Sequence, residues 1–429
     1  MQNINIVFEH LNEDKTDLVW PNGIEKNDQE KYNLCYFQLG PGGYNLHIIF
    51  RNGTKSDNVK LFHYKELESG VLPKDEKYLY FLDISKPWNY PQMFKYDNFF
   101  TIPKLILNDV KNNKARIVIF IGYEGTGFAP IQFDPVITYI QNMIKNNGLP
   151  QHGIVYADGN VLCEAHLKQF NIKGYYYNVF QSAKYYNIDY VTPEKYNEIK
   201  NNIINKVSRP KKYLCFNRAP REHRGYLVER MLKNNLVEDA IVTHCGVDYI
   251  DNVAGLKSNP FPYHLNIDVE YLKKHVPLVY DVKDIKKENP NYLNVEAQTK
   301  CYFNVVTETW FDHDPTRMYY SEKIFKPITC LQPFILVGQP FSLRLLRDMG
   351  FKTFGNFIDE SYDETINKIE RLDKIMEVVK KIYSMSQAEL NDMLYNMLPV
   401  LEWNYNNNVF VSHLQDGNHF LERIINDWD

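Results

Sequence analysis

The chain has 429 residues, of which 44% are hydrophobic and 24% charged, and its net charge is −4 at pH 7. This composition is typical of a folded globular protein with about two domains. No stretch approaches the roughly 18 apolar residues of a membrane-spanning helix, so no membrane span is expected. The mildly acidic charge argues against a dedicated nucleic-acid coat, although a local basic groove is still compatible with it.

The six cysteines are scattered singly and most lie inside apolar runs, with no C-x-x-C pair. This pattern favours buried free thiols over disulfides or a zinc site. The N-terminal residues lack the basic start and long apolar stretch of a signal peptide and look like a buried strand. We therefore expect a cytoplasmic protein, in the host cytoplasm if it is viral, and no obligate protein partner is evident.

Apolar runs alternate with helical patterns along the first half of the chain. Strands are predicted at 4–8, 46–50, 78–82, 117–121, 154–156 and 175–179, and helices at 135–145 and 193–206. Several of the runs are apolar throughout, which suits strands that are covered on both faces. Strands alternating with helices predict a mainly parallel α/β sheet.

The short polar segment 207–212 contains a proline, and we place a domain boundary there. Behind it, strands are predicted at 213–216, 240–243, 302–306 and 334–337, and helices at 221–234, 322–331, 341–349, 363–383, 387–397 and 419–428. The expected fold class is α/β, with two Rossmann-like domains at 1–208 and 209–429 facing a central cleft. Whether the last helix packs back on the N-terminal domain is left open.

The most informative segment is 320–328, where Ser321, Glu322 and Lys323 stand at the start of a predicted helix. A helix start collects unpaired N–H groups and the positive end of the helix dipole, so it suits an anion such as a diphosphate. Lys323 adds a positive charge, and Glu322 can accept hydrogen bonds from sugar hydroxyls. This combination is what a nucleotide-sugar site needs, but an ordinary Ser-capped surface helix is the alternative. Pro327 implies that the helix is kinked or begins later than Ser321.

A basic turn follows the strand predicted at 213–216. Arg218, together with Arg221 or Arg224, is a candidate diphosphate clamp, because the planar guanidinium matches phosphate oxygens. The alternative is a solvated helix start, although a basic first turn opposes the helix dipole. His223 in the same turn could contact phosphate or sugar, and an ordinary histidine on the helix surface is the favoured alternative.

Three carboxylates follow predicted strands. Glu308 could bind a ribose or sugar hydroxyl, or it could cap a turn. Glu124 stands on a glycine-containing turn and is our candidate for the base that takes the proton of an acceptor hydroxyl. Asp158 is the second candidate for the same role, and for each of the two an ordinary turn residue is the favoured alternative.

The adjacent residues Asp312, His313 and Asp314 resemble metal ligands at first sight. Neighbouring loop residues point in different directions, so a polar loop is the better interpretation. The sequence therefore predicts no metal site and no cofactor.

Segments 213–218 (YLCFNR) and 320–324 (YSEKI) resemble the donor half of GT-B glycosyltransferases, most closely the α-1,3-fucosyltransferase group. The wider pattern, over about residues 210–360, is also similar to glycosyltransferase-like proteins of phages and large viruses. The resemblance implies that Arg218 and Lys323 hold the donor diphosphate and Glu322 the ribose. The first domain shows no acceptor motif that we can match.

The resemblance implies an inverting enzyme that moves a sugar from a nucleotide-diphosphate donor to a hydroxyl. The missing D-x-D-like acidic motif in the right context and the available cations predict that it needs no metal ion. The 32 tyrosines and 25 phenylalanines resemble A+T-rich phage or viral coding, so a hydroxymethylated base in phage DNA is one candidate acceptor. A glycan or lipid-linked sugar is the other, because the acidic net charge counts against DNA. A non-catalytic nucleotide- or carbohydrate-binding protein is the rival hypothesis.

Overall fold

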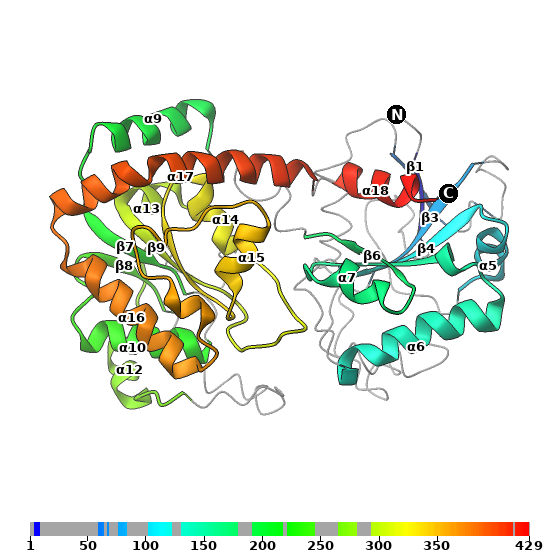
Figure 1. The fold of residues 1–429 in the computed structure, drawn as a ribbon, viewed down its shortest axis with the longest axis horizontal. Helices are drawn as coiled ribbons and strands as arrows, with labels where there is room; N and C mark the ends of the chain where they lie inside the picture. Colours follow the sequence, from blue (N-terminus) through cyan, green and yellow to red (C-terminus); the bar gives the residue numbers. More distant parts are fainter. Residues whose placement is uncertain are drawn as a thin grey trace. The chain divides into compact units, whose positions relative to one another are not determined.

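The computed structural model describes residues 4–8, 59–63, 67, 76–83, 102–121, 130–178, 191–217, 221–244, 265–280, 293–414 and 417–428. The chain forms two compact units, each with helices around its own parallel sheet (Figure 1). The first unit comprises Met1–Tyr185, Asp314–Tyr319 and Ser412–Asp429, and the second comprises Tyr186–His313 and Tyr320–Val411. The predicted α/β class with two Rossmann-like sheets is confirmed.

The first sheet has the strand order β2-β1-β3-β4-β5-β6, with every neighbouring pair parallel. Its strands are β1 (Ile4–Phe8), β2 (Val59–His63), β3 (Tyr78–Asp83), β4 (Ala115–Ile121), β5 (Ile154–Asp158) and β6 (Lys173–Tyr176). The apolar runs of β3, β4 and β5 lie in the middle of the sheet and are almost fully buried, as expected for strands covered on both faces. The structure adds β2, which the sequence did not predict, and the strand predicted at 46–50 lies outside the described residues.

The helices of the first unit are α5 (Lys104–Lys111), α6 (Pro130–Asn147), α7 (Cys163–Lys168) and α18 (Gly417–Asn426), with a short 3-10 turn at Gln151–Gly153. Helix α6 begins at Pro130, ahead of the predicted start at Pro135. The sequence misled here because Asp134 followed by Pro135 has the signature of a helix start.

Helix α18 packs on the sheet of the first unit through aromatic rings and Arg116. The ring of Phe420 lies 4.5 Å from that of Tyr177, and Phe420 is almost fully buried. Arg116 donates to the carbonyls of Ile424 at 2.8 Å and Asp427 at 2.6 Å, and its guanidinium lies over the ring of Trp428. A buried cation thus satisfies carbonyls at the C-terminal end of the helix.

The segment Asp314–Tyr319 is also part of the first unit, although it lies between two elements of the second. The side-chain amide of Asn160 donates to the carbonyl of Thr316 at 2.9 Å and accepts from the N–H of Met318 at 3.1 Å. Val161 adds a main-chain bond to the carbonyl of Met318 at 2.9 Å. Asn160 is fully buried and therefore fixes this segment against the turn that follows β5.

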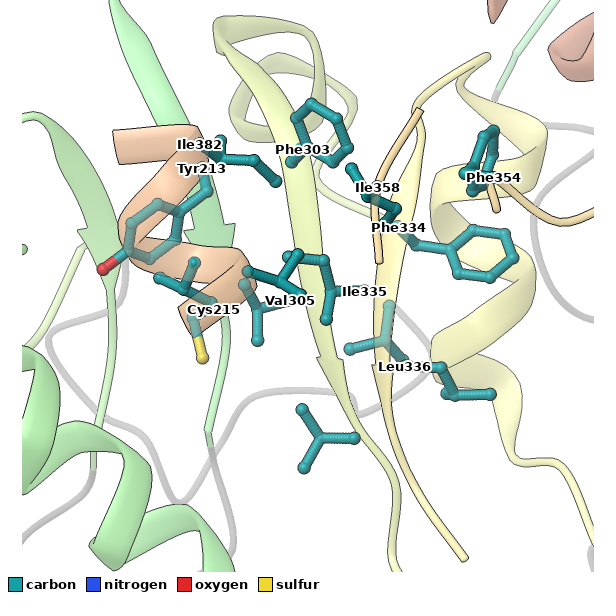
Figure 2. Close-up of a cluster of buried hydrophobic side chains, with 14 of the residues drawn as sticks. Tyr213, Cys215, Phe303, Val305, Phe334, Ile335, Leu336, Phe354, Ile358 and Ile382 are labelled. Carbon is teal, nitrogen blue, oxygen red and sulfur yellow. The ribbon is translucent and has the colours of Figure 1, made fainter. Parts of the chain in front are cut away.

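The second sheet has the order β10-β9-β7-β8, again with all neighbours parallel. Its strands are β7 (Lys211–Cys215), β8 (Ala240–Val242), β9 (Cys301–Thr307) and β10 (Phe334–Val337). All seven residues of β9 are buried. Figure 2 shows part of the apolar cluster on this sheet, which includes Tyr213, Cys215, Phe303, Val305, Phe334, Ile335, Leu336, Phe354, Ile358 and Ile382.

The helices of the second unit are α9 (Pro193–Ile204), α10 (Glu222–Lys233), α12 (Val269–His275), α13 (Val295–Lys300), α14 (Glu322–Thr329), α15 (Ser342–Asp348), α16 (Lys368–Ser384) and α17 (Gln387–Leu414), with a 3-10 turn, η7, at Ser361–Glu364. Helix α14 begins directly after Ser321 and continues through Pro327. Helix α17 is much longer than the predicted 387–397, because Pro399 does not end it.

Helix α9 belongs to the second unit, in which it packs on α17. Tyr196 donates to Glu402 at 3.1 Å, and its ring lies 4.5 Å from that of Tyr405. The units divide at residues 185 and 186, so the polar segment 207–212 lies inside the second unit and leads into β7.

The described cysteines Cys163, Cys215, Cys301 and Cys330 are free and buried, as predicted. Within the described ranges, no helix has the length and apolar content required to cross a membrane.

Replacing Trp428 by alanine should destabilise the first unit by about 3–5 kcal/mol, the usual cost of truncating a buried large aromatic side chain. The indole is 3% exposed and donates to Asn113 at 2.9 Å. Calorimetric unfolding measures the loss. Trp403→Ala on α17 is the control, because Trp403 is 50% exposed and should cost much less. Equal losses in the two variants would contradict the described packing of the C-terminal residues.

Candidate functional site

Topology points to one place on the second sheet where a ligand is expected. Strands β7 and β9 are neighbours, and the strands that follow them in the order of the sheet's own elements, β8 and β10, lie on opposite outer sides of this pair. The connections that leave β7 and β9 therefore diverge. In parallel α/β sheets the crevice at the carboxyl ends of two such strands is the usual ligand site. A cluster of polar residues follows β7, which ends at Cys215, and β9, which ends at Thr307.

Side chains from the connection after β7 hold the exit of β9. Arg224 donates through Nη2 to the carbonyls of Thr307 at 3.0 Å and Glu308 at 3.1 Å. The Nε2 atom of His223 lies 3.0 Å from the same carbonyl of Glu308. The hydroxyl of Thr307 donates to the Asn217 side chain at 2.7 Å, so the two strand exits are joined by buried polar contacts.

The start of α14 completes this cluster. Ser321 is its N-cap, with its hydroxyl oxygen accepting from the N–H of Lys323 at 3.3 Å. The same hydroxyl donates to Oε2 of Glu308 at 2.5 Å and accepts from Nζ of Lys323 at 2.9 Å. Lys323 also lies 3.3 Å from Glu322 and 3.4 Å from the hydroxyl of Thr309. One cation therefore stands among two hydroxyls and two carboxylates.

The two carboxylates have opposite electrostatic environments. Burial raises the pKa of Glu308, against the opposing effects of Lys323 and the Ser321 hydrogen bond. Burial also acts to raise the pKa of Glu322, but Lys323 and Lys326 outweigh it and the net pKa is lowered. Within the described structure, Oε1 of Glu308 is buried and has no hydrogen-bond partner, so this oxygen is an unused acceptor.

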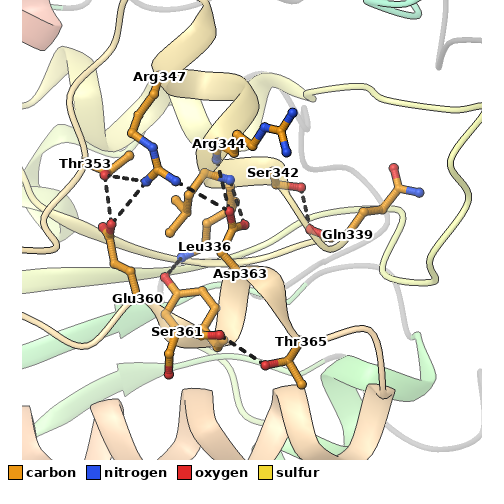
Figure 3. Close-up of polar contacts among 12 residues, drawn as sticks. Leu336, Gln339, Ser342, Arg344, Arg347, Thr353, Glu360, Ser361, Asp363 and Thr365 are labelled. Carbon is orange, nitrogen blue, oxygen red and sulfur yellow. Dashed lines mark hydrogen bonds and ion pairs between the residues drawn. The ribbon is translucent and has the colours of Figure 1, made fainter.

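The start of α15 is closed by a carboxylate from η7. Asp363 accepts from the N–H groups of Leu343 at 2.8 Å and Arg344 at 3.0 Å (Figure 3). An acid at this position already neutralises the helix start, so an anion is not expected to bind there. Figure 3 also shows the guanidinium of Arg344 directed away from Asp363, and it has no hydrogen bond or ion pair within the described part of the chain.

The structure brings together Glu308, Ser321, Glu322 and Lys323 from the predicted site. Arg224 lies in the same cluster, but it is buried and its Nη2 binds main-chain carbonyls, so it builds the site instead of facing an open surface.

Arg221 is the N-cap of α10, is partly buried and has no side-chain capping bond. Its guanidinium has no ion pair to any described residue. Arg218 and Glu124 lie outside the described residues.

Asp158 ends β5 in the first unit and is fully buried. Its Oδ2 accepts from the hydroxyl of Tyr156 at 2.8 Å, and its Oδ1 accepts from the N–H of Asn160 at 2.7 Å. A carboxylate that is closed off and uses both oxygens in this way is poorly suited to take a proton from a substrate. Glu124 therefore stays the first candidate base and Asp158 the second.

The acidic loop residues already have partners within the protein. Asp312 forms an ion pair with Lys368, and Asp314 accepts from the N–H of Thr316 at 2.9 Å and from its hydroxyl. Among the described residues no group of three His, Cys, Asp or Glu side chains is arranged to hold a metal ion.

Sequence reasoning missed two features of this site. The expectation that His223 is an ordinary surface histidine is wrong, because the ring is fully buried and stacks on Phe311. Thr309 and Asn217 were not proposed as site residues, although each follows a strand closely, which is the signal that could have found them.

Comparison with known proteins finds similarity only in the fold of the backbone. No family model and no curated protein sequence matches the chain. Among solved structures, α,α-trehalose-6-phosphate synthase from Burkholderia multivorans is similar with a TM-score of 0.45 and 10% identity, over 100% of this chain and 96% of that one. Trehalose-6-phosphate synthase OtsA gives a TM-score of 0.44 and 12% identity, over 100% and 99% of the two chains.

Replacing Glu308 by glutamine should make the protein more stable at pH 7. Because the pKa of Glu308 is raised in the folded state, the folded protein binds a proton on the Glu308 carboxylate more strongly than the unfolded chain does. Its contribution to the free energy of unfolding therefore falls as pH rises from the ordinary glutamate pKa through the raised value. Glutamine keeps the acceptor for Ser321 and removes the buried charge. Melting temperatures measured between pH 4.5 and 8 should show a flatter profile for the variant.

Glu389→Gln is a control of opposite sign. Glu389 is exposed, and hydrogen bonds from the side chain and N–H of Ser386 lower its pKa. Its stabilising contribution is present above the ordinary pKa and is lost as pH falls, so this variant should be less stable near neutral pH. A Glu308→Gln protein that loses stability at pH 7 in the same way would show that the charge of Glu308 is well compensated.

Proposed function

We propose that the chain is a glycosyltransferase that uses a nucleotide-diphosphate sugar as its donor. The observation that carries this proposal is the cluster at the exits of β7 and β9, where Lys323, the start of α14 and the start of α10 stand beside Glu308. Ligands of parallel α/β sheets bind at such a position. The cluster contains both a cation for phosphate and acceptors for hydroxyl groups, which together match a nucleotide sugar.

The diphosphate would bind to Lys323 and to the N–H groups at the starts of α10 and α14. Arg221, at the N-cap of α10, is a further cation with no ion pair among the described residues. Asp363 brings a negative charge to the start of α15, whereas the start of α14 has the neutral cap Ser321 and that of α10 has no side-chain cap, so the anion is assigned to these two helices. Cations at this position stabilise the charge that develops on the leaving diphosphate, and this term usually dominates such a reaction.

The resemblance to the donor half of GT-B glycosyltransferases supports the same assignment. It adds Arg218 as a second diphosphate ligand and gives Glu322 the ribose. Glu308 would accept a hydrogen bond from a hydroxyl of the donor through Oε1. We propose an inverting reaction without a metal ion, on the ground that lysine and arginine side chains supply the positive charge.

We propose that the first unit binds the acceptor and that Glu124 takes the proton of its hydroxyl. A hydroxymethylated base in phage DNA and a glycan or lipid-linked sugar are the two candidate acceptors. A gel shift with hydroxymethylated DNA that weakens with salt would favour DNA, since phosphate contacts release counterions. No shift at low salt would favour the sugar acceptors.

The donor assignment is tested with a panel of UDP-, GDP- and other nucleotide sugars. At least one should raise the melting temperature and be slowly hydrolysed, whereas binding without hydrolysis would favour the non-catalytic rival. Lys323→Ala should then weaken binding of that donor by about 10- to 100-fold, the usual range for a hydrogen bond to a charged group. Lys300→Ala is the matched control. Lys300 also pairs with a glutamate, but it directly precedes β9 and so lies at the amino end of that strand, opposite to the candidate site. Unchanged affinity in Lys323→Ala would refute the phosphate role.

Glu124→Ala should abolish turnover with donor affinity unchanged, because a base acts on the acceptor only in the chemical step. The expected loss in kcat is about 10²–10⁴-fold. Asp158→Asn is the comparison, since the buried hydrogen bonds of Asp158 predict an effect on stability instead of on the chemical step. Full turnover in Glu124→Ala would require a different base.

A further inference from the structure

His223 holds a fixed position at the proposed donor site. Its ring is fully buried and stacks on Phe311, with ring centres 5.0 Å apart and an angle of 13° between the planes. Its Nε2 atom lies 3.0 Å from the carbonyl oxygen of Glu308. Two restraints, one on the ring face and one on Nε2, therefore leave only Nδ1 free to meet another group.

The partner of Nε2 determines which nitrogen carries the proton. A carbonyl oxygen can only accept a hydrogen bond, so Nε2 must be the N–H donor. A second proton on Nδ1 would place a buried cation beside the guanidinium of Arg224. Burial and then Arg224 hold the pKa of His223 well below its usual value, in agreement with this geometry. The Nε2 contact and the burial together favour a neutral ring, in which Nδ1 presents a lone pair.

That lone pair has no partner in the described structure. An unsatisfied buried acceptor typically costs about 1–3 kcal/mol, so such groups are uncommon unless a ligand or water uses them. A second unused acceptor, Oε1 of Glu308, belongs to the same residue whose carbonyl binds Nε2. Two buried acceptors without partners thus stand on a single polar unit beside the starts of α10 and α14.

We propose that Nδ1 of His223 and Oε1 of Glu308 form an acceptor pair that receives hydrogen bonds from hydroxyl groups of the bound donor. This inference rests on the proposed function, and it names the part of the donor that the pair recognises. Phosphate oxygens are excluded as partners, because they carry no hydrogen to donate and would face two lone pairs. The hydroxyls belong either to the ribose or to the transferred sugar, and His223 acts as a specificity residue for one of them.

The test separates the two nitrogens of His223. In His223→Asn the amide oxygen keeps an acceptor near Nδ1, whereas in His223→Gln the amide nitrogen keeps a donor near Nε2. Calorimetric titration with UDP and GDP, their 2′-deoxy counterparts, UDP-glucose and GDP-mannose gives the affinities. We expect His223→Gln to weaken binding about 10-fold, the effect of about 1.4 kcal/mol, and His223→Asn to weaken it less.

The probes distinguish the two sources of the hydroxyl. If the ribose is recognised, wild type binds the ribonucleotide more tightly than its 2′-deoxy form, and His223→Gln removes that difference. If the transferred sugar is recognised, the variant removes the gain of the nucleotide sugar over the nucleotide. Equal affinities of wild type and His223→Gln for every probe would overturn the inference and leave the donor site itself standing.

Two further outcomes are decisive. Nitrogen NMR of histidine-labelled protein should show His223, assigned from the signal missing in His223→Gln, as the neutral form protonated on Nε2 at pH 7. A proton on Nδ1 overturns the inference whatever the binding data show. If none of the nucleotides binds to wild type, the proposed function and the acceptor pair both fail, a result that differs from selective failure of the variants.

Discussion

The hydrogen bonds from Arg224 and His223 to the carbonyl of Glu308 are the constraint on which the candidate site depends. They tie the start of α10 to the exit of β9, and the side chain of Glu308 in turn ties that exit to Ser321 at the start of α14. Loss of one partner would leave another charge or carbonyl buried without compensation, which is costly in a medium of low polarity. The two helix starts and the strand exit therefore form one cooperative polar unit.

Local patterns in the sequence predicted much of the fold. The apolar runs within β3 and β4, and the mainly apolar segments 213–216 and 302–306, identified strands, and Ser321 before Glu322 identified the start of α14. These predictions were correct because an apolar run that signals a buried strand and a Ser that signals an N-cap are both patterns of neighbouring residues.

Long-range contacts explain what the sequence did not predict. Asp363 caps α15 from about twenty residues away in the sequence. The carbonyl of Ile424 in α18 accepts from Arg116, which is some three hundred residues away in the sequence. Arg224 and His223 belong to a basic turn that looks solvated in the sequence. Both are buried instead, against the exit of β9, which follows them by some eighty residues in the chain. No local pattern of charge or hydrophobicity distinguishes a cation that faces a ligand from one that holds a main-chain carbonyl.

The two units are discontinuous in the chain, and this affects how the protein can be made and divided. The first unit needs Asp314–Tyr319, which Asn160 holds, and Ser412–Asp429, which follows all residues of the second unit in the chain. Its sheet can form early in synthesis, but its packing is complete only after Ser412–Asp429 has also emerged. A fragment ending near residue 185 would expose the surface that Phe420 and Trp428 cover, so the halves cannot be separated at a single cut without loss.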